Sequence, residues 1–213
     1  MLQLRQRIAM IHELVGHIEN IKGYFLEDKR IINFVAYRPG NTDLEMIGEK
    51  VAFLSQNTQV KPESHDSICE AIMRLGIDQI ISKGNPSLVT NIAKEISEKE
   101  QMTDFASKYC AAHWPYHYPL FNNHSVKVLG TICGTSHGLT DYETYCRQMH
   151  RLKSAYKMHA LNFFEVSKLF WIYQHHLTDS LNLINDCYEQ RDSNGPDDLH
   201  VSFKYSGIGS KII

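Results

Sequence analysis

The segment from Asp104 to Leu129, DFASKYCAAHWPYHYPLFNNHSVKVL, contains the residue types in this chain that could carry out chemistry. Lys108 falls inside a short helical pattern, and a loop rich in aromatic residues, histidine and proline follows it. Asn122 comes next and would open a second helix, because asparagine is among the preferred N-cap residues. One segment therefore combines a possible nucleophile, stacking rings and a helix N-terminus.

Lys108 has two interpretations, which follow from its neighbours. An amine is a nucleophile only when it is partly neutral near pH 7, which requires burial or a nearby cation that lowers its pKa. Phe105, Tyr109 and Trp114 could supply the burial. Alternatively, Lys108 lies on the exposed face of its helix and pairs with Asp104 at position i−4.

The loop and the start of the following helix are expected to line a pocket for a base, because aromatic faces and a few hydrogen bonds recognise an extrahelical base. The candidate pocket residues are His113, Trp114, Tyr116, His117, Tyr118, Phe121, Asn123 and His124. The alternative is an ordinary aromatic core that packs the loop. Three histidines could ligate zinc on a continuous helix, but Pro115 and Pro119 break helical geometry, so we expect no metal and no cofactor.

Basic residues exceed acidic ones by seven to three between residues 105 and 175, in a chain whose formal net charge is −2. The whole chain therefore gives no basic signal for nucleic acid, and any polyanion site must be local. The residues that we expect to contact DNA phosphates are Lys127, Arg147, Arg151 and Lys153. A solvated helix face is the alternative, and it would not make binding sensitive to salt.

The stretch FASKYCAAHWPYHYPLFNN resembles the segment that carries the catalytic lysine in the helix-hairpin-helix DNA glycosylase superfamily. The resemblance is to the prokaryotic branch with an 8-oxoguanine DNA glycosylase-type fold, where F-A-S-K precedes a Pro-containing loop and P-I-Y-D-S. Pro119, Leu120 and Phe121 occupy the P-I-Y places. The later NFFEVSKLFWIY, residues 162–173, is similar to the C-terminal core helix of that family.

The resemblance implies that Lys108 attacks or contacts the sugar, and it places Asn122 where the family has an aspartate. An asparagine can orient the sugar or a water by hydrogen bonds, but it does not carry the negative charge. The residues from Gln101 to Asp104 stand where the hairpin of the family usually has a Gly-hydrophobic-Gly turn.

Helical periodicity dominates the chain that must position these residues. Apolar spacing predicts helices from about residue 4 to 18, 42 to 55, 65 to 82, 87 to 99, 122 to 132, 140 to 155 and 163 to 183. A further helix carries Lys108, with Thr103 or Asp104 as its cap. The segment Ile31 to Tyr37 fits a short strand or a buried helix end. We therefore expect a mainly α fold, with one compact multi-helix domain of the glycosylase type over residues 1–190. Its site-bearing core would cover about residues 87–183, and residues 191–213 would form a flexible tail.

The remaining composition limits the class of protein. Five cysteines without a C-x-x-C pair argue against a disulfide framework and against a Cys-rich zinc site. The N-terminus is charged and amphipathic, and no apolar run of about 18 residues exists. We therefore expect a cytoplasmic monomer without a membrane partner.

Together these patterns predict a DNA glycosylase that flips a modified base out of duplex DNA and cleaves its N-glycosidic bond, in base-excision repair or in defence against phage. Two alternatives stay open. One is a DNA-binding protein without enzymatic activity on the same scaffold. The other is a helical module for protein interaction.

Overall fold

The computed structural model describes residues 26–56, 58, 60–97, 102–134, 139 and 141–174. Within these ranges it contains nine α-helices, one short 3₁₀-helix and no strand. The expected mainly α fold is therefore confirmed. The predicted N-terminal helix from residue 4 to 18, the end of the helix predicted to residue 183 and the tail from 191 to 213 lie outside the described residues.

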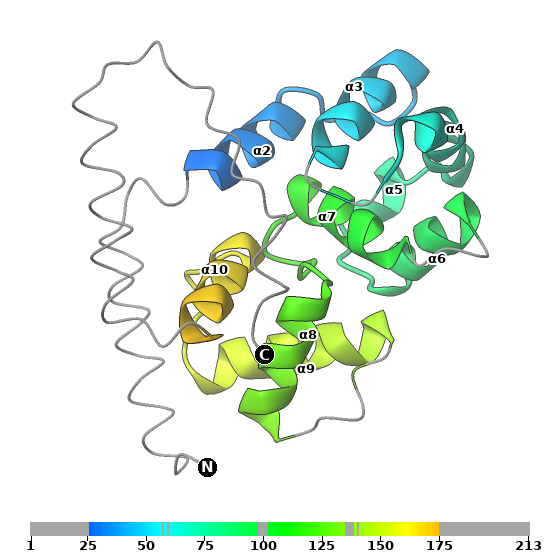
Figure 1. The fold of residues 1–213 in the computed structure, drawn as a ribbon. Helices are drawn as coiled ribbons and strands as arrows, with labels where there is room; N and C mark the ends of the chain where they lie inside the picture. Colours follow the sequence, from blue (N-terminus) through cyan, green and yellow to red (C-terminus); the bar gives the residue numbers. More distant parts are fainter. Residues whose placement is uncertain are drawn as a thin grey trace, which may run out of the picture.

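The helices form two groups on either side of a central helix, α7 (Figure 1). The helices before it are α2 (Leu26–Ala36), α3 (Leu44–Ser55), η2 (Pro62–Ser64), α4 (His65–Leu75), α5 (Asp78–Ile81) and α6 (Ser87–Ile96). The central helix and those after it are α7 (Thr103–His113), α8 (Asn123–Cys133), α9 (Tyr142–Ala155) and α10 (Phe163–Gln174). α7 packs against α2, α3 and α6, and α8 packs against α9 and α10.

Capping residues set where several helices begin. The side chain of Asp43 accepts a hydrogen bond from the backbone N–H of Glu45 at the start of α3. Asp141 accepts in the same way from Thr144 at the start of α9. These bonds satisfy N–H groups that have no partner inside the helix. The N-cap of α3 is thus Asp43, and the helix begins at Leu44 rather than at about residue 42.

Two boundaries differ from the sequence prediction. The segment around Ile31 belongs to helix α2, where Ile31 and Val35 are buried four residues apart, so the strand alternative is wrong. The helix predicted from residue 65 to 82 is split at Gly76, which adopts a left-handed conformation with φ of 56°. Glycine takes up this conformation without a steric penalty and ends α4 there.

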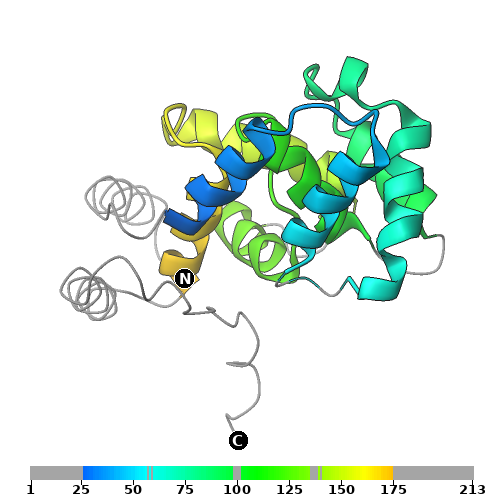
Figure 2. The same cartoon turned by 90° about the horizontal axis from the view of Figure 1, so that it is seen from above.

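The core surrounds α7, whose buried residues include Phe105, Tyr109 and Cys110. Seen from above, α2 lies beside α10 (Figure 2). A buried ion pair joins these two helices, with 3.8 Å between Lys168 Nζ and Asp28 Oδ2. The four cysteines within the described residues are free thiols. None of the described helices has the length and apolar character needed to cross a membrane.

Candidate functional site

Lys108 is half-buried on α7 and lies against the C-terminal end of α3. Its Nζ donates hydrogen bonds to the carbonyl oxygens of Leu54 (2.9 Å) and Gln56 (3.3 Å). The C-terminal end of a helix carries partial negative charge, so this contact stabilises the protonated ammonium. Of the three residues expected to bury Lys108, Phe105 and Tyr109 are buried, whereas Trp114 is 40% exposed.

Asn122 caps α8, as the sequence predicted. Its Oδ1 accepts a hydrogen bond from the backbone N–H of Ser125 at 2.8 Å. The Nδ2 group of Asn122 makes no hydrogen bond within the described residues. This asparagine therefore presents two N–H donors toward its surroundings, whereas an aspartate would present a charged acceptor.

Ser107 connects the helix that carries Lys108 to the loop that ends at Asn122. Its buried hydroxyl donates to the carbonyl oxygen of Asp104 at 2.8 Å and accepts from the backbone N–H of Phe121 at 2.9 Å. Lys108 follows Ser107 and Asn122 follows Phe121, so this bond holds the start of α8 against α7. We call these five residues, Asp104, Ser107, Lys108, Phe121 and Asn122, the Lys108 centre.

Tyrosine hydroxyls fix the loop before Asn122. Tyr142 donates to the carbonyl oxygen of Pro119 at 3.1 Å, and Tyr145 donates to that of Leu120 at 2.7 Å. Burial raises the pKa of Tyr145 above its ordinary value, which keeps its hydroxyl protonated as a donor. The ring of Phe121 packs edge-on against Tyr145 with 5.1 Å between centroids. The loop is therefore built into the core.

The predicted base-pocket residues separate into inner and outer groups. Tyr118 is fully buried and donates to the carbonyl oxygen of Ile81 at 2.8 Å, so it belongs to the core and does not line an open pocket. The outer group consists of Trp114, Tyr116, His117 and Asn123, which are exposed, and of Phe121 and His124, which are half-buried.

His113 belongs to the inner group. It is half-buried, and its Nε2 atom is buried without a hydrogen-bond partner among the described residues. Burial, together with the charge of Lys50, lowers the pKa of His113 to about 3, although Asp78 opposes this shift. The His113 ring therefore stays neutral near pH 7. The described residues contain no cluster of three metal-ligating His, Cys, Asp or Glu side chains.

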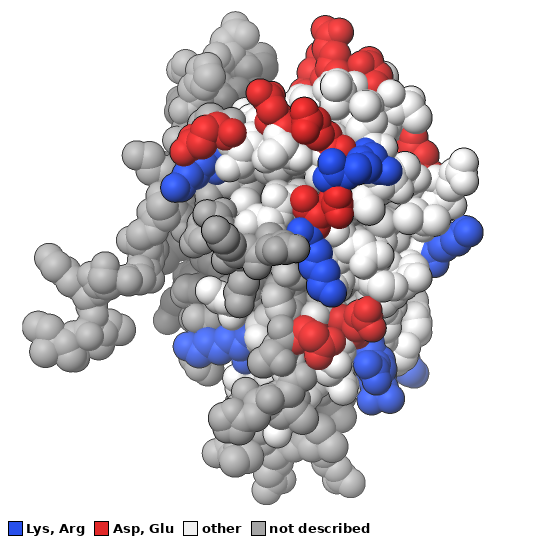
Figure 3. All heavy atoms as spheres, turned by 90° about the vertical axis from the view of Figure 1, so that its right-hand side faces the viewer, with Lys and Arg blue, Asp and Glu red and all other residues white. Residues whose placement is uncertain are grey.

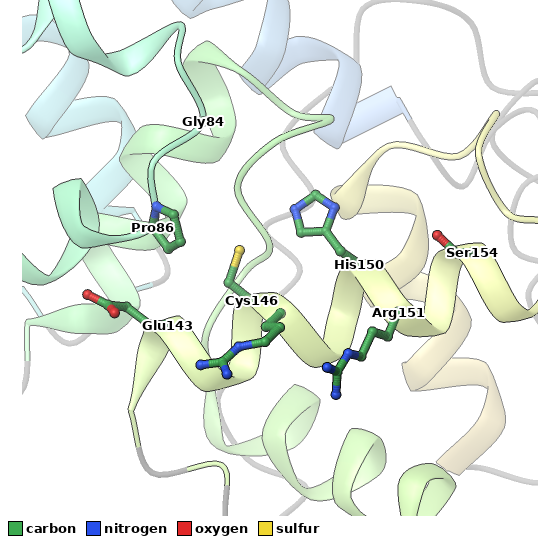
Figure 4. Close-up of a pocket in the computed structure, with 8 residues that line it drawn as sticks. Gly84, Pro86, Glu143, Cys146, His150, Arg151 and Ser154 are labelled. Atoms are coloured by element: carbon green, nitrogen blue, oxygen red, sulfur yellow. The ribbon is translucent and has the colours of Figure 1, made fainter.

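A groove of about 650 Å³ separates α9 from the turn between α5 and α6. It is lined by Gly84, Pro86, Glu143, Cys146, Arg147, His150, Arg151 and Ser154. Cys146 and His150 point from α9 toward the turn, whereas the guanidinium of Arg151 points away from it (Figure 4). Arg147 and Arg151 are exposed, and neither makes an ion pair or a side-chain hydrogen bond within the described residues.

The other two predicted phosphate contacts behave differently. Lys127 is exposed on α8. Lys153 is buried, with its Nζ donating to the carbonyl oxygen of Leu161 at 2.6 Å and lying 4.5 Å from the ring centre of Phe163. Burial lowers the pKa of Lys153, and Glu165 opposes this effect. Placing Lys153 among the phosphate contacts is therefore wrong for this conformation.

Charges of both signs are mixed on the face shown in Figure 3, without a continuous positive field. A polyanion would therefore be held on this face by individual cations rather than by a broad basic surface. Arg147 and Arg151, both exposed, lie four residues apart on α9 at the groove.

A buried polar network near α7 was missed by the sequence prediction. Lys50 is fully buried and donates to the carbonyl oxygen of Gly40 and to Asn41 Oδ1, both at 2.6 Å. Asn41 also accepts from the Tyr109 hydroxyl and donates to Asp78. Burial lowers the pKa of Lys50 to about 8, and Asp78 opposes this effect. The available signal was a lysine between apolar neighbours on the inner face of α3.

Residues 10–117, just over half of the chain, match a family model named HI_0787_N and described as an N-terminal domain. The chain therefore belongs to this family. The match covers α2 to α7 and includes Lys108, but it ends before Asn122 and before the α9 wall of the groove. No curated protein and no solved structure matches the chain.

Proposed function

We propose that this protein binds duplex DNA and hydrolyses the N-glycosidic bond of a modified base at the Lys108 centre. The observation that carries the proposal is the hydrogen bond from Phe121 N–H to Ser107 Oγ, which places a lysine-bearing helix beside an asparagine-capped helix start. α6 packs on α7, the helix that carries the lysine. This order of elements agrees with the resemblance of the segment to DNA glycosylases.

The contacts of Lys108 favour one mechanism over another. Two carbonyl oxygens at the end of α3 accept hydrogen bonds from its Nζ, which favours the charged form, and a charged amine does not attack a carbon atom. Lys108 would therefore act as a cation that holds the sugar-phosphate backbone, and water would be the nucleophile. The free amide of Asn122 would position the sugar or that water by hydrogen bonds.

DNA contacts would come from side chains outside this centre. Arg147 and Arg151 have free guanidinium groups that can bind phosphate oxygens. Trp114 and Tyr116 are 40% and 52% exposed in the loop after α7, and such rings can stack on an unpaired base. Each of these groups is accessible without a rearrangement of the core.

The test is release of free base from a panel of duplex DNAs that carry damaged or hypermodified bases. We expect abasic sites in at least one duplex, and no covalent adduct when borohydride is added during the reaction. Lys108→Ala should lower the rate at least about tenfold, since positioned groups typically contribute this much or more. Lys94→Ala, an exposed lysine on α6, is the matched control and should leave the rate unchanged.

Two results would contradict the proposal. Absence of base release from every duplex would refute the enzymatic function. A borohydride adduct that is lost in Lys108→Ala would show that the lysine, and not water, is the nucleophile.

Binding to DNA without catalysis is the second candidate, and the amide at Asn122 favours it because an amide cannot carry negative charge toward a cationic sugar. It predicts salt-sensitive binding to unmodified duplex that persists in Lys108→Ala without base release. Arg147→Ala with Arg151→Ala should weaken that binding and reduce its dependence on salt. Arg74→Ala, which removes an arginine already paired with Glu95, serves as the control. A module for protein interaction would show no salt-sensitive binding to duplex DNA.

A further inference from the structure

The groove between α9 and the turn from α5 to α6 lies where two parts of the chain meet. The turn, with Gly84 and Pro86, belongs to residues 10–117, which match the family model, whereas α9 follows that match. Ligand sites occur preferentially at such junctions. The groove volume of about 650 Å³ also falls within the range of ligand pockets, about 300–1,000 Å³. The groove therefore has the place and the size of a binding site.

The loop after α7 is attached to the walls of this groove. His150 points from α9 toward the turn (Figure 4), and its Nε2 atom donates to the carbonyl oxygen of His117 at 3.2 Å. Phe163 holds the same loop, because its backbone N–H donates to the carbonyl oxygen of Pro115 at 2.8 Å and its ring packs edge-on against His150. On the side of the turn, a Cβ atom at Gly84 would lie 2.8 Å from the His117 ring. His117 thus lies beside both walls.

Two exposed aromatic rings extend the groove along this loop. Trp114 is 40% exposed, and its ring lies edge-on to the ring of His117 with 5.9 Å between centroids. Tyr116 is 52% exposed, and its ring centre lies 5.5 Å from Nζ of Lys153 on α9. Because His117 contacts His150 in the groove, the two rings and the groove form one continuous surface.

The α9 wall supplies the charge of this surface. Arg147 and Arg151 line the groove and are exposed, and neither makes an ion pair or a side-chain hydrogen bond within the described residues. Glu143 is the acid among the lining side chains, so two arginines stand against one glutamate. The lining is therefore complementary to a chain of phosphates.

Cations beside exposed rings fit a single DNA strand better than a duplex. Sites for single strands combine a positively charged groove that follows the backbone with aromatic side chains on which the bases stack. In a duplex the bases are paired and stacked on each other, so Trp114 and Tyr116 would find no free base. A duplex would then depend on phosphate contacts alone, and the face in Figure 3 has no continuous positive field to supply them.

We propose that the groove and the two loop rings form a binding site for an unpaired DNA strand, which we call the single-strand groove. Arg147 and Arg151 bind its phosphates, and Trp114 and Tyr116 stack on its bases. This inference rests on the DNA binding in the proposed function, and it adds that the strand beside the modified base is bound unpaired. The protein therefore prefers single-stranded DNA to a duplex of the same sequence.

The experiment measures binding of a labelled oligothymidylate of about 12 nucleotides, a length within the site sizes of single-strand binders, by fluorescence anisotropy. We expect the free strand to bind at least about tenfold more tightly than the strand paired with its complement. Trp114→Ala should weaken single-strand binding about 5- to 150-fold, the value of one base stacked on a ring, and change duplex binding less than about twofold. Tyr37→Ala removes an exposed ring on α2 and should change neither affinity.

The fluorescence of Trp114 tests directly whether a base stacks there. The unlabelled strand should quench the tryptophan fluorescence of the wild type. Trp114→Phe keeps a stacking ring and leaves Trp171 as the remaining tryptophan, so this variant should still bind the strand but lose most of the quenching. Quenching that is unchanged in Trp114→Phe would show that the strand does not lie on this loop.

The salt dependence of binding tests the two arginines. Each phosphate contact contributes about 0.7 to the slope of log K against the logarithm of the salt concentration for a single strand. Arg147→Ala combined with Arg151→Ala should therefore reduce this slope by about 1.4. Arg74→Ala, which removes an arginine paired with Glu95, should leave the slope unchanged.

The two proposals fail in different ways. If the duplex binds as tightly as the free strand, or if the Trp114 and arginine variants bind both DNAs like the wild type, the single-strand groove is wrong and the glycosylase function is unaffected. If the wild type releases no base from any DNA but binds the free strand with the expected dependence on Trp114 and on salt, the glycosylase function fails and the single-strand groove stands. Absence of binding to either DNA would refute both.

Discussion

At the scale of single residues, Ser107 joins the two segments of the Lys108 centre, which are α7 and the start of α8. Its buried hydroxyl is the partner of Phe121 N–H, and Ser107→Ala would leave that buried donor unsatisfied. An unsatisfied buried donor costs about 1–3 kcal/mol, so we expect a loss of unfolding free energy of this size in urea titrations. Ser67→Ala is the matched control, because this exposed serine makes only a local bond to Ser64 and should cost less than about 0.5 kcal/mol. An equal loss in both variants would contradict the role given to Ser107.

From the sequence, the local role of a residue could be predicted more reliably than whether its side chain is buried. Asn122 was recognised as a cap because capping depends on neighbours within one turn of helix, and the structure confirms it. The sequence predicts Tyr118 in a pocket, but this tyrosine is buried and donates a hydrogen bond to Ile81. It predicts Lys153 on the surface, but this lysine is buried and donates a hydrogen bond to Leu161. A single sequence does not show which side of a loop or helix faces other elements, so these two assignments could not be made correctly from it.

At the scale of elements, the turn between α5 and α6 packs closely against the loop after α7. Gly84 has φ of 65°, and a Cβ atom there would lie 2.8 Å from Nδ1 and 3.2 Å from Cβ of His117. Gly76 has φ of 56° but has nothing within 4 Å of such an atom. Gly76→Ala should therefore cost about 1–2 kcal/mol from backbone strain alone, and Gly84→Ala should cost measurably more.

Thermal denaturation of the two glycine variants tests this fit. Adding His117→Ala to Gly84→Ala should remove most of the extra destabilisation of Gly84→Ala relative to Gly76→Ala. The remaining loss of stability is then that of the backbone strain. If both single variants melt at the same temperature, the turn is not in close contact with His117.

The sequence predicts one helix where the structure has two, α4 and α5, because apolar periodicity does not show the left-handed turn at Gly76.

At the scale of the whole molecule, the fold class was predictable because the 3.6-residue apolar period runs through most of the chain. The polar network in which the buried Asn41 and Lys50 join the exposed Asp78 was not predictable, because it connects a turn, α3 and α5 through side chains 9 and 37 residues apart in the sequence. The network also places Lys50 and Asp78 near His113 on α7. Because Lys50 and Asp78 influence the pKa of His113, the network should affect how the stability of the folded state depends on pH.

His113 should make the folded state less stable in acid. Its pKa is lowered from 6.5 to about 3, so between these pH values the unfolded chain binds a proton that the folded protein does not. Stability is therefore retained above about pH 6.5 and lost as the pH falls toward about 3. The contribution lost by pH 4 should be about 2–3 kcal/mol. Urea titrations at pH 7 and pH 4 should thus show a smaller loss for His113→Gln than for the wild type. His159→Gln, which changes an exposed histidine, should lose as much unfolding free energy between pH 7 and pH 4 as the wild type. An equal loss in all three proteins would show that His113 does not determine the stability of the protein in acid.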